Sequence, residues 1–124
     1  LFDFSEEGNV HGLGILPGNI RLFPPEKMID NQGIKLKVPH IGWNRVDYAK
    51  THPLFQRIEN GTRFYFVHSY YFDAEGESYS VGQTDYPFTF TSAVAQDNLF
   101  AVQFHPEKSQ EAGLILLENF VNWL

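Results

Sequence analysis

The residues best suited to chemistry lie in one short run, Val102-Gln103-Phe104-His105-Pro106-Glu107-Lys108-Ser109-Gln110. An apolar strand is expected to end in His-Pro-Glu, with a helix beginning just after it. In an extended segment residues two apart project to the same side, and Pro106 restricts the path between them. His105 and Glu107 are therefore expected to project together. A carboxylate that orients an imidazole, which then moves protons for a nucleophile, suits covalent catalysis. The alternative is a surface histidine beside a solvated glutamate.

Composition narrows the classes of protein that this chain can belong to. The 124 residues suffice for one small domain, and 43% hydrophobic residues argue against disorder. The net charge of −6 disfavours nucleic-acid binding, which needs a basic patch. We find no apolar stretch long enough for a membrane helix and no signal segment, so we expect no membrane contact and a cytoplasmic location. The absence of cysteine excludes a disulfide framework within this sequence and leaves the catalytic nucleophile unidentified.

The five histidines raise the question of a metal site. They are His11, His40, His52, His68 and His105. Their spacings match neither H-x₃₋₅-H nor H-E-x-x-H, the patterns that indicate zinc from sequence. We therefore predict no metal and no cofactor.

Alternating and aromatic-rich runs predict a chain made mostly of strands. The strongest strand covers residues 62–72, and residues 53–58 are expected to form one helical turn or a short helix that begins at Pro53. Gly76, Pro87 and Asp97-Asn98 mark turns, and Asp97-Asn98 resembles a two-residue hairpin connection. The other expected strands cover residues 19–23, 34–38, 45–48, 78–85, 89–95 and 99–104.

One helix is expected at the end of the chain, over residues 109–124. Ser109 is a suitable N-cap, and Glu111 lies in the first turn, where the helix dipole favours negative charge. Three- and four-residue spacing predicts one apolar face. That face comprises Gly113, Leu116, Leu117, Phe120, Val121 and Leu124.

Four segments together resemble the class I, triad-type glutamine amidotransferases, and more narrowly the glutaminase subunit of imidazole glycerol phosphate synthase in histidine biosynthesis. His-Pro-Glu is shared widely in the family, whereas the combination of all four segments is typical of the histidine-pathway type. The segments are Gly12-Leu13-Gly14-Ile15-Leu16-Pro17-Gly18, Val38-Pro39-His40-Ile41-Gly42-Trp43-Asn44, Phe64-Tyr65-Phe66-Val67-His68-Ser69-Tyr70-Tyr71, and the run from Val102 to Gln110.

The resemblance covers the whole chain but matches only the C-terminal part of the family's domain. It implies an α/β fold, the C-terminal part of a flavodoxin-like three-layer domain, and residues 1–124 as a single partial domain. The family's N-terminal part supplies a Gly-x-Cys-x-Gly turn that bears the nucleophile. We therefore expect a truncated piece that is inactive alone. A truncated sheet would expose an edge and an apolar face, so we also expect self-association.

The chemistry implied by the resemblance is hydrolysis of L-glutamine to glutamate and ammonia through a cysteine thioester. His105 would activate the thiol, protonate ammonia and activate water, and Glu107 would orient His105. Ser69 and Tyr70 match positions that hold the backbone groups of glutamine. Ammonia would pass to a (β/α)8-barrel cyclase subunit. The resemblance places Trp43, Asn44, Tyr65 and Lys108 near that partner.

Each of these roles has a simpler alternative. Trp43 and Tyr65 could be ordinary packing aromatics, since tryptophan and tyrosine serve both cores and interfaces. Lys108 could be a solvated lysine near the start of a helix, and Ser69 and Tyr70 could pack within a strand.

Two other functions remain open, together with one structural alternative. The chain could be a non-catalytic remnant that still binds the cyclase. It could instead belong to a paralogue that amidates a surface-polysaccharide sugar, because the glutamine chemistry would be identical. A small aromatic-rich β domain that merely resembles the family would require four ordered motifs to be coincidental.

Overall fold

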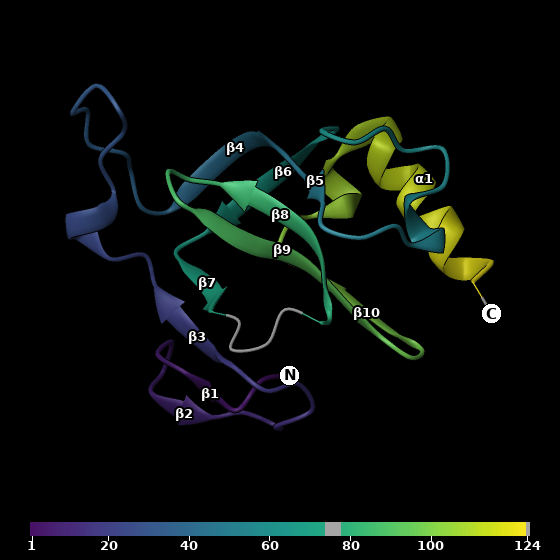
Figure 1. Ribbon diagram of the computed structural model, residues 1–124, viewed down its shortest axis with the longest axis horizontal. Coiled ribbons are helices and arrows are strands. Elements are labelled where there is room, and N and C mark those ends of the chain that lie inside the picture. Colours follow the sequence, from purple (N-terminus) through teal and green to yellow (C-terminus); the bar gives the residue numbers. More distant parts are fainter. Residues whose placement is uncertain (74–77, 124) are drawn as a thin grey trace.

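The computed structural model describes residues 1–73 and 78–123 and has a mixed α/β fold, with a strand-rich sheet and one C-terminal helix (Figure 1). The fold class that we expected, strands with one closing helix, is confirmed. The strands are β1 (Phe4–Ser5), β2 (Val10–His11), β3 (Asn19–Leu22), β4 (His40–Arg45), β5 (Asp47–Tyr48), β6 (Arg63–His68), β7 (Tyr70–Asp73), β8 (Ser80–Asp85), β9 (Thr89–Gln96) and β10 (Leu99–Val102). The helices are the 3₁₀ turns η1 (Pro25–Lys27), η2 (Pro53–Phe55) and η3 (Pro106–Lys108), and α1 (Gln110–Val121).

Eight strands form one sheet in the order β2-β1-β3-β7-β9-β8-β5, with β10 also paired to β9. Among the described residues only β1 and β3 pair in parallel. Because β9 bonds β8 along one side and both β10 and β7 along the other, it lies at the centre of the sheet.

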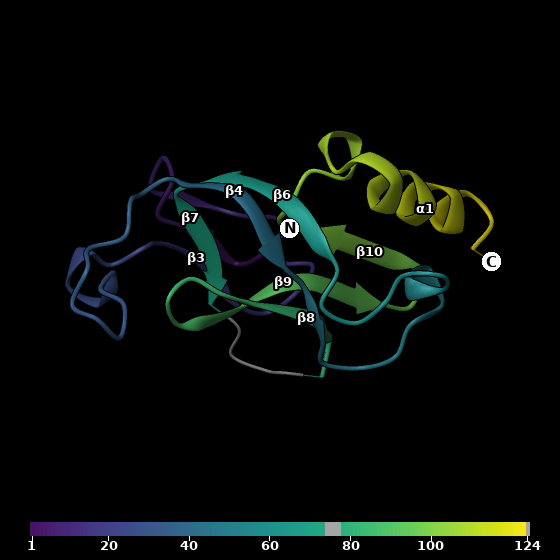
Figure 2. The same cartoon turned by 90° about the horizontal axis from the view of Figure 1, so that it is seen from above.

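A separate antiparallel ribbon, β4–β6, lies over β8 and β9 (Figure 2). Its register pairs His40 with His68 and Trp43 with Tyr65. Successive side chains on β6 alternate between the two faces, so Phe64, Phe66 and His68 are buried. The ribbon therefore closes the core on one side and presents a second face to solvent.

The main core fills the space between ribbon, sheet and helix. Aromatic rings dominate it, which explains the high phenylalanine content. Its buried residues are Phe23, Met28, Val46, Leu54, Phe55, Ile58, Phe64, Phe66, Val81, Phe90, Ala93, Phe104 and Leu116. Full burial of each large side chain contributes about 1.5–3 kcal/mol, so this cluster fixes how the ribbon sits on the sheet.

The expected strand over residues 62–72 is two strands that belong to different sheets. β6 ends at His68, and β7 begins at Tyr70 and pairs with β3. Ser69 lies at the break, where its carbonyl accepts a hydrogen bond from the Phe23 N–H. An aromatic-rich run carries no signal for this change of partner, because both halves favour strand equally.

The expectation of a strand over residues 34–38 is wrong. This segment forms only an isolated bridge, between Ile29 and Lys35, in a loop that projects from the body of the molecule (Figure 1). The Asp30 carboxylate accepts hydrogen bonds from the N–H groups of Gln32 and Ile34 and so folds the loop back on itself. A local turn bonded by a side chain competes with strand formation here.

Several shorter expectations are confirmed with small shifts at their ends. β3, β8, β9 and β10 lie within or close to the expected ranges, and η2 supplies the helical turn after His52. The strand expected over residues 45–48 begins earlier, at His40, and is interrupted at Val46. Leu99 pairs with Gln96, so Asp97-Asn98 is the expected two-residue connection, with Asp97 in the left-handed region (φ 53°). Gly76 lies outside the described residues.

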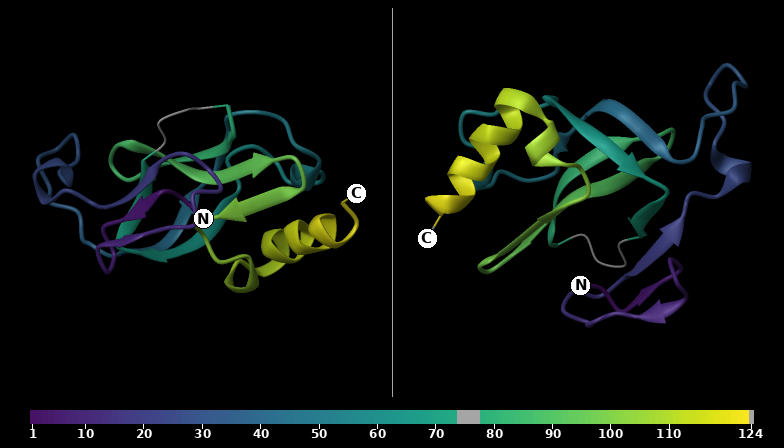
Figure 3. Two further views of the ribbon diagram at one scale, coloured as in Figure 1. Left: turned by 90° about the horizontal axis from the view of Figure 1, so that it is seen from below. Right: turned by 180° about the vertical axis from the view of Figure 1, so that it is seen from behind.

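The C-terminal helix differs from expectation at both ends. It begins at Gln110 and ends at Val121, and Leu124 lies outside the described residues. The Ser109 hydroxyl makes no cap bond to the helix. Among the described members of the expected apolar face, only Gly113 and Leu116 are buried. The helix lies beside the ribbon at one end of the molecule, with one side open (Figure 3).

We predict that the 124-residue chain self-associates through this open side of α1. Leu114, Leu117, Phe120 and Val121 are 41–78% exposed on the same helix, and such apolar surface drives association. The mass from light scattering should rise with protein concentration. Lysines at Phe120 and Val121 should return it to that of a monomer, whereas lysines at the polar Gln110 and Asn122 should not. A monomer mass across a wide concentration range would contradict the prediction.

Candidate active site

His105 and Glu107 are paired, as their spacing predicts. The distance from His105 Nδ1 to Glu107 Oε1 is 2.8 Å. The conformation between them is not the extended one that we expected, because Pro106–Lys108 forms a 3₁₀ turn. The 3₁₀ turn, instead of an extended backbone, brings the two side chains to the same side. Since an ionised carboxylate only accepts hydrogen bonds, His105 Nδ1 is the donor and Nε2 of the neutral ring is left unprotonated.

Strand β6 holds this turn through both backbone polar groups of one residue, Tyr65. The His105 N–H donates to the Tyr65 carbonyl at 2.9 Å, and the Tyr65 N–H donates to Ser109 Oγ at 3.0 Å. The Ser109 hydroxyl in turn donates to the His105 carbonyl at 2.6 Å. Ser109 is 1% exposed, so the hydroxyl that joins these bonds is itself shielded from water. The side chain that we expected to cap the helix instead locks His105 to β6.

Gly113 allows the helix to approach the turn closely. A Cβ atom built on Gly113 would lie 1.8 Å from the Pro106 carbonyl oxygen, which no side chain can tolerate. Glycine, which we expected only as part of an apolar face, is therefore required at this position for α1 to pack against η3.

The Glu107 carboxylate is held in its ionised form. Hydrogen bonds from its own backbone N–H and from His105 lower the pKa of the Glu107 carboxyl below its ordinary value. The two side chains are nonetheless 37% and 58% exposed, for His105 and Glu107 respectively. The pair can orient an imidazole at neutral pH but lies open to solvent in this chain.

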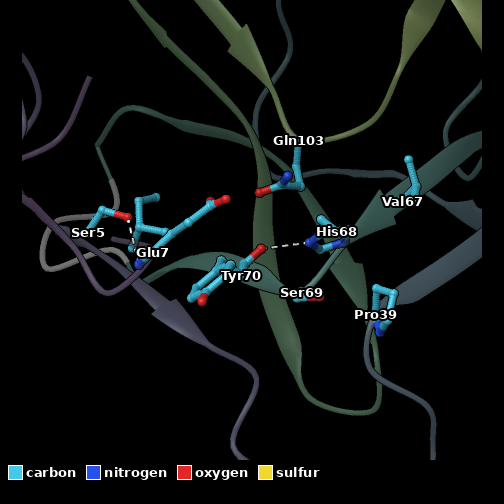
Figure 4. Close-up of a pocket in the computed structure, with 9 residues that line it drawn as sticks. Ser5, Glu7, Pro39, Val67, His68, Ser69, Tyr70 and Gln103 are labelled. Carbon is cyan, nitrogen blue, oxygen red and sulfur yellow. Dashed lines mark hydrogen bonds between the residues drawn. The ribbon is translucent and has the colours of Figure 1, made fainter. Parts of the chain in front are cut away.

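Ser69 and Tyr70 line a cleft of about 590 Å³ between the N-terminal segment and the start of β7 (Figure 4). The cleft is lined by Ser5, Glu7, Ile20, Pro39, Val67, His68, Ser69, Tyr70 and Gln103. Gln103 lies two residues before His105, so β10 leads from the cleft to the His-Glu turn. The structure thus brings Ser69 and Tyr70 together in the cleft and places His105 and Glu107 on the adjoining turn.

Glu7 is a residue of this cleft that the sequence analysis did not single out. Of the described residues that line the cleft, it alone carries a carboxylate. Figure 4 shows it reaching from the N-terminal segment toward the side formed by Tyr70 and Gln103. Its run, Ser5-Glu6-Glu7-Gly8, is typical of a polar turn, and nothing in that pattern indicates that the chain folds back against β7.

The proposed partner residues fall on two faces. Trp43 and Tyr65 meet across the ribbon with their ring centroids 6.0 Å apart, on the face directed away from the core. Lys108 is exposed on η3. The Asn44 side chain belongs to the opposite face, where its amide donates to the Asp85 carbonyl at 2.9 Å. The structure therefore groups Trp43 with Tyr65 and separates Asn44 from them.

Two further histidines, which the sequence analysis considered only as metal ligands, are buried next to the cleft. His40 Nδ1 and His68 Nε2 lie 2.9 Å apart. Burial, followed by the neighbouring His68, lowers the pKa of His40 from 6.5 to about 4, and burial also lowers the pKa of His68. Both rings are therefore neutral at pH 7. Within residues 1–73 and 78–123 no three His, Cys, Asp or Glu side chains are grouped to hold a metal ion.

Comparison with known proteins identifies the family of this chain. The family model for class I glutamine amidotransferases matches residues 10–123. The chain belongs to the class I glutamine amidotransferase family. The matched region contains Ser69, Tyr70, His105 and Glu107, whereas Glu7 precedes it.

Among curated members of the family, the chain is similar to the HisH subunit of imidazole glycerol phosphate synthase. It is 60% identical to HisH of Nitrosospira multiformis, 59% to that of Thiobacillus denitrificans and 55% to that of Neisseria meningitidis, each over 123 residues or 99% of the chain. These matches cover 58%, 54% and 58% of the relatives. The chain thus spans a little over half the length of these amidotransferases. None of the helices described here is long and apolar enough to cross a bilayer.

We predict that Ser109→Ala destabilises the chain by about 1–3 kcal/mol, because it leaves the Tyr65 N–H, which bonds the buried Ser109 hydroxyl, without an acceptor. Ser78→Ala, at an exposed position, should change the free energy of unfolding by less than about 0.5 kcal/mol. Urea denaturation of both variants measures the difference. An equal, small effect of the two substitutions would show that the Ser109 bonds do not hold the turn.

Proposed function

We propose that residues 1–124 form one partial domain, the C-terminal portion of a HisH-type glutaminase that hydrolyses L-glutamine and delivers ammonia to a cyclase partner. The observation that carries the proposal is the His105–Glu107 pair, fixed to β6 beside a cleft, in a chain 60% identical to a HisH subunit. The amidotransferase family supplies the reaction class, and the geometry supports the assignment of roles.

In this proposal His105 is the general base and acid. Its Nδ1–H is donated to Glu107, so Nε2 can accept the proton of a cysteine thiol. The thiolate attacks the side-chain amide carbon of glutamine, and the protonated imidazole gives its proton to the departing ammonia. His105 then takes a proton from water, which cleaves the thioester to glutamate and regenerates the thiol. The cysteine belongs to the N-terminal part of the family's domain, since this chain contains none.

The cleft is the proposed binding site for the backbone groups of glutamine. An amino-acid substrate presents an ammonium and a carboxylate at one end, and the Glu7 carboxylate complements the ammonium. Ser69 and Tyr70 hold the remaining backbone groups, as the family resemblance implies. Gln103 lies on the side of the cleft that leads to His105.

The proposed partner is a (β/α)8-barrel cyclase subunit that contacts the outer face of the ribbon. Trp43 is 42% exposed although it is a large aromatic ring, and Ile41 and Val67 are exposed beside it. Exposed aromatic clusters of this kind are enriched in protein interfaces. Lys108 extends the contact from η3, and Asn44 supports it from the opposite face of β4.

The same face supports a second candidate, a non-catalytic module that binds the cyclase without making ammonia. The exposed Trp43–Tyr65 pair favours binding, and the absence of cysteine from these 124 residues is consistent with a lack of catalysis. A paralogue that serves a sugar acceptor would share the cleft and the His-Glu turn, so the acceptor substrate separates it from the HisH type.

The test is a chimera in which residues 1–123 replace the matching segment of the Nitrosospira multiformis HisH, assayed with that organism's cyclase subunit. We expect ammonia release from glutamine by the chimera and none by the 124-residue chain. His105→Asn should lower kcat by about 10³- to 10⁶-fold, since loss of a triad member leaves only residual catalysis. His11→Asn, a change at an exposed histidine outside the cleft, should have little effect. Full activity of the His105 variant would refute the assignment, and a folded but inactive chimera would favour the binding module.

We further predict that Glu7→Gln in this chimera raises KM for glutamine by about 10-fold or more, because a charge-assisted hydrogen bond to the ammonium is lost. The rate at saturation should change little. Glu6→Gln is the matched control, because Glu6 carries the same charge but pairs with Arg21 outside the cleft. Equal effects of the two substitutions would indicate long-range electrostatics instead of direct contact.

A further inference from the structure

His40 and His68 are buried imidazoles for which the proposed chemistry has no use. They are 3% and 8% exposed and face each other across the β4–β6 ribbon. His68 also lines the cleft, where Figure 4 shows its ring bonded to Tyr70. A buried polar pair that is kept beside a binding site needs a structural explanation, because burying unbonded imidazoles is costly.

The hydrogen bond between His68 and Tyr70 fixes the tautomer of His68. Its Nδ1 lies 2.7 Å from the Tyr70 carbonyl oxygen. A carbonyl oxygen only accepts, so His68 Nδ1 carries the proton and Nε2 is an acceptor. His40 Nδ1, at 2.9 Å, must then be the donor to His68 Nε2.

The contacts with Asn44 fix the tautomer of His40 independently. Asn44 Oδ1 accepts from the Arg45 N–H at 2.7 Å, which orients the amide group. Its nitrogen then donates to the Asp85 carbonyl and, at 3.2 Å, faces His40 Nε2. His40 Nε2 must therefore be unprotonated, which again leaves the proton on Nδ1. The two ends require the same arrangement, and every donor meets an acceptor.

We propose that His40 and His68 are positioning residues, a neutral relay that ties the Tyr70 carbonyl at the cleft to Asn44 on β4 and fails when either ring is protonated. The effect on glutamine rests on the proposed function, whereas the relay itself does not. A second proton on His40 would point Nε2–H at the Asn44 amide hydrogens. A second proton on His68 would point Nε2–H at the proton of His40 Nδ1. Neither ring can therefore be charged without breaking a link.

The surroundings of the pair reinforce its neutral form. Phe66 and Tyr86 stack on His40, and Phe23, Phe66 and Phe90 pack on His68. The titratable groups that face the pair are the Tyr86 phenol, whose hydroxyl donates to the Lys37 carbonyl, and His105, which in its protonated form would disfavour a positive charge on His68. Asp85 meets the relay through its carbonyl.

Because both rings are neutral in the folded chain, the stability of the fold is expected to decrease at acid pH. Burial lowers the pKa of His40 to about 4, while in the unfolded chain its pKa is near 6.5. Between these values the unfolded chain binds more protons than the folded one, so stability is lost as pH falls from 6.5 toward 4. The depressed pKa of His68 acts in the same direction.

The first measurement is the tautomer of each ring by nitrogen-15 NMR on the histidine-labelled 124-residue chain at pH 7. We expect Nδ1–H, with unprotonated Nε2, on both His40 and His68. Nε2–H or a charged ring at either residue overturns the relay, whatever the outcome for the proposed function.

The second measurement uses His40→Phe, which keeps a ring between Phe66 and Tyr86 but removes both nitrogens. The acid-side fall in unfolding free energy should become shallower in the 124-residue variant. In the chimera KM for glutamine should rise about 5- to 10-fold, the effect of one lost hydrogen bond, with kcat nearly unchanged. His40→Asn, which restores a donor near the Nδ1 position, should raise KM less than His40→Phe does. His11→Phe should leave KM unchanged.

The outcomes separate the two proposals. An unchanged KM for His40→Phe in an active chimera overturns the positioning role, even if the tautomers agree. An inactive chimera with both rings in the Nδ1–H form refutes the proposed function and leaves the relay established as a structural feature.

Discussion

The two backbone hydrogen bonds of Tyr65 are the interaction on which the rest of the site depends. Its carbonyl and its N–H face η3, where they bond His105 and Ser109. These two bonds join the His-Glu turn to β6 instead of leaving it on a free loop. The turn is therefore held in place by a strand whose Phe64 and Phe66 side chains are packed in the core. A catalytic side chain needs such support, because small displacements from productive geometry are costly in rate.

The alternation along β6 divides three tasks among consecutive residues. Phe64 and Phe66 pack into the core, and Tyr65 points outward beside Trp43. His68 lies on the same buried face as the two phenylalanines and lines the cleft. The period of two in a strand makes this division possible within six residues. Substitutions at neighbouring positions of β6 therefore act on packing, on the outer face or on the cleft, and the three effects are separable by position.

The sequence predicts most strands, the terminal helix and the pairing of His105 with Glu107, because apolar alternation and short-range spacing are local signals. The break at Ser69 could not be predicted, since it depends on which strand each half pairs with. The loop over residues 34–38 was missed because the Asp30 turn competes with strand pairing. The sequence analysis did not assign Glu7 to the cleft or a positioning role to the buried His40–His68 pair, because each depends on contacts between segments far apart in the chain. Ser109 was noticed as a helix cap, and only the structure shows that its hydroxyl bonds His105.

Exposure distinguishes the two histidine sites of this chain. The relay pair is buried and keeps its tautomers through bonds to groups that cannot change protonation, namely backbone carbonyls and an amide. His105 is open to solvent and is oriented by a carboxylate, whose attraction is screened by water where the pair is exposed. Covering this turn would strengthen the His105–Glu107 interaction and hold the imidazole more firmly, because the local dielectric would fall. The orientation of His105, the proposed general base, is therefore sensitive to what packs over η3, whereas the geometry at Tyr70 is set within the chain itself.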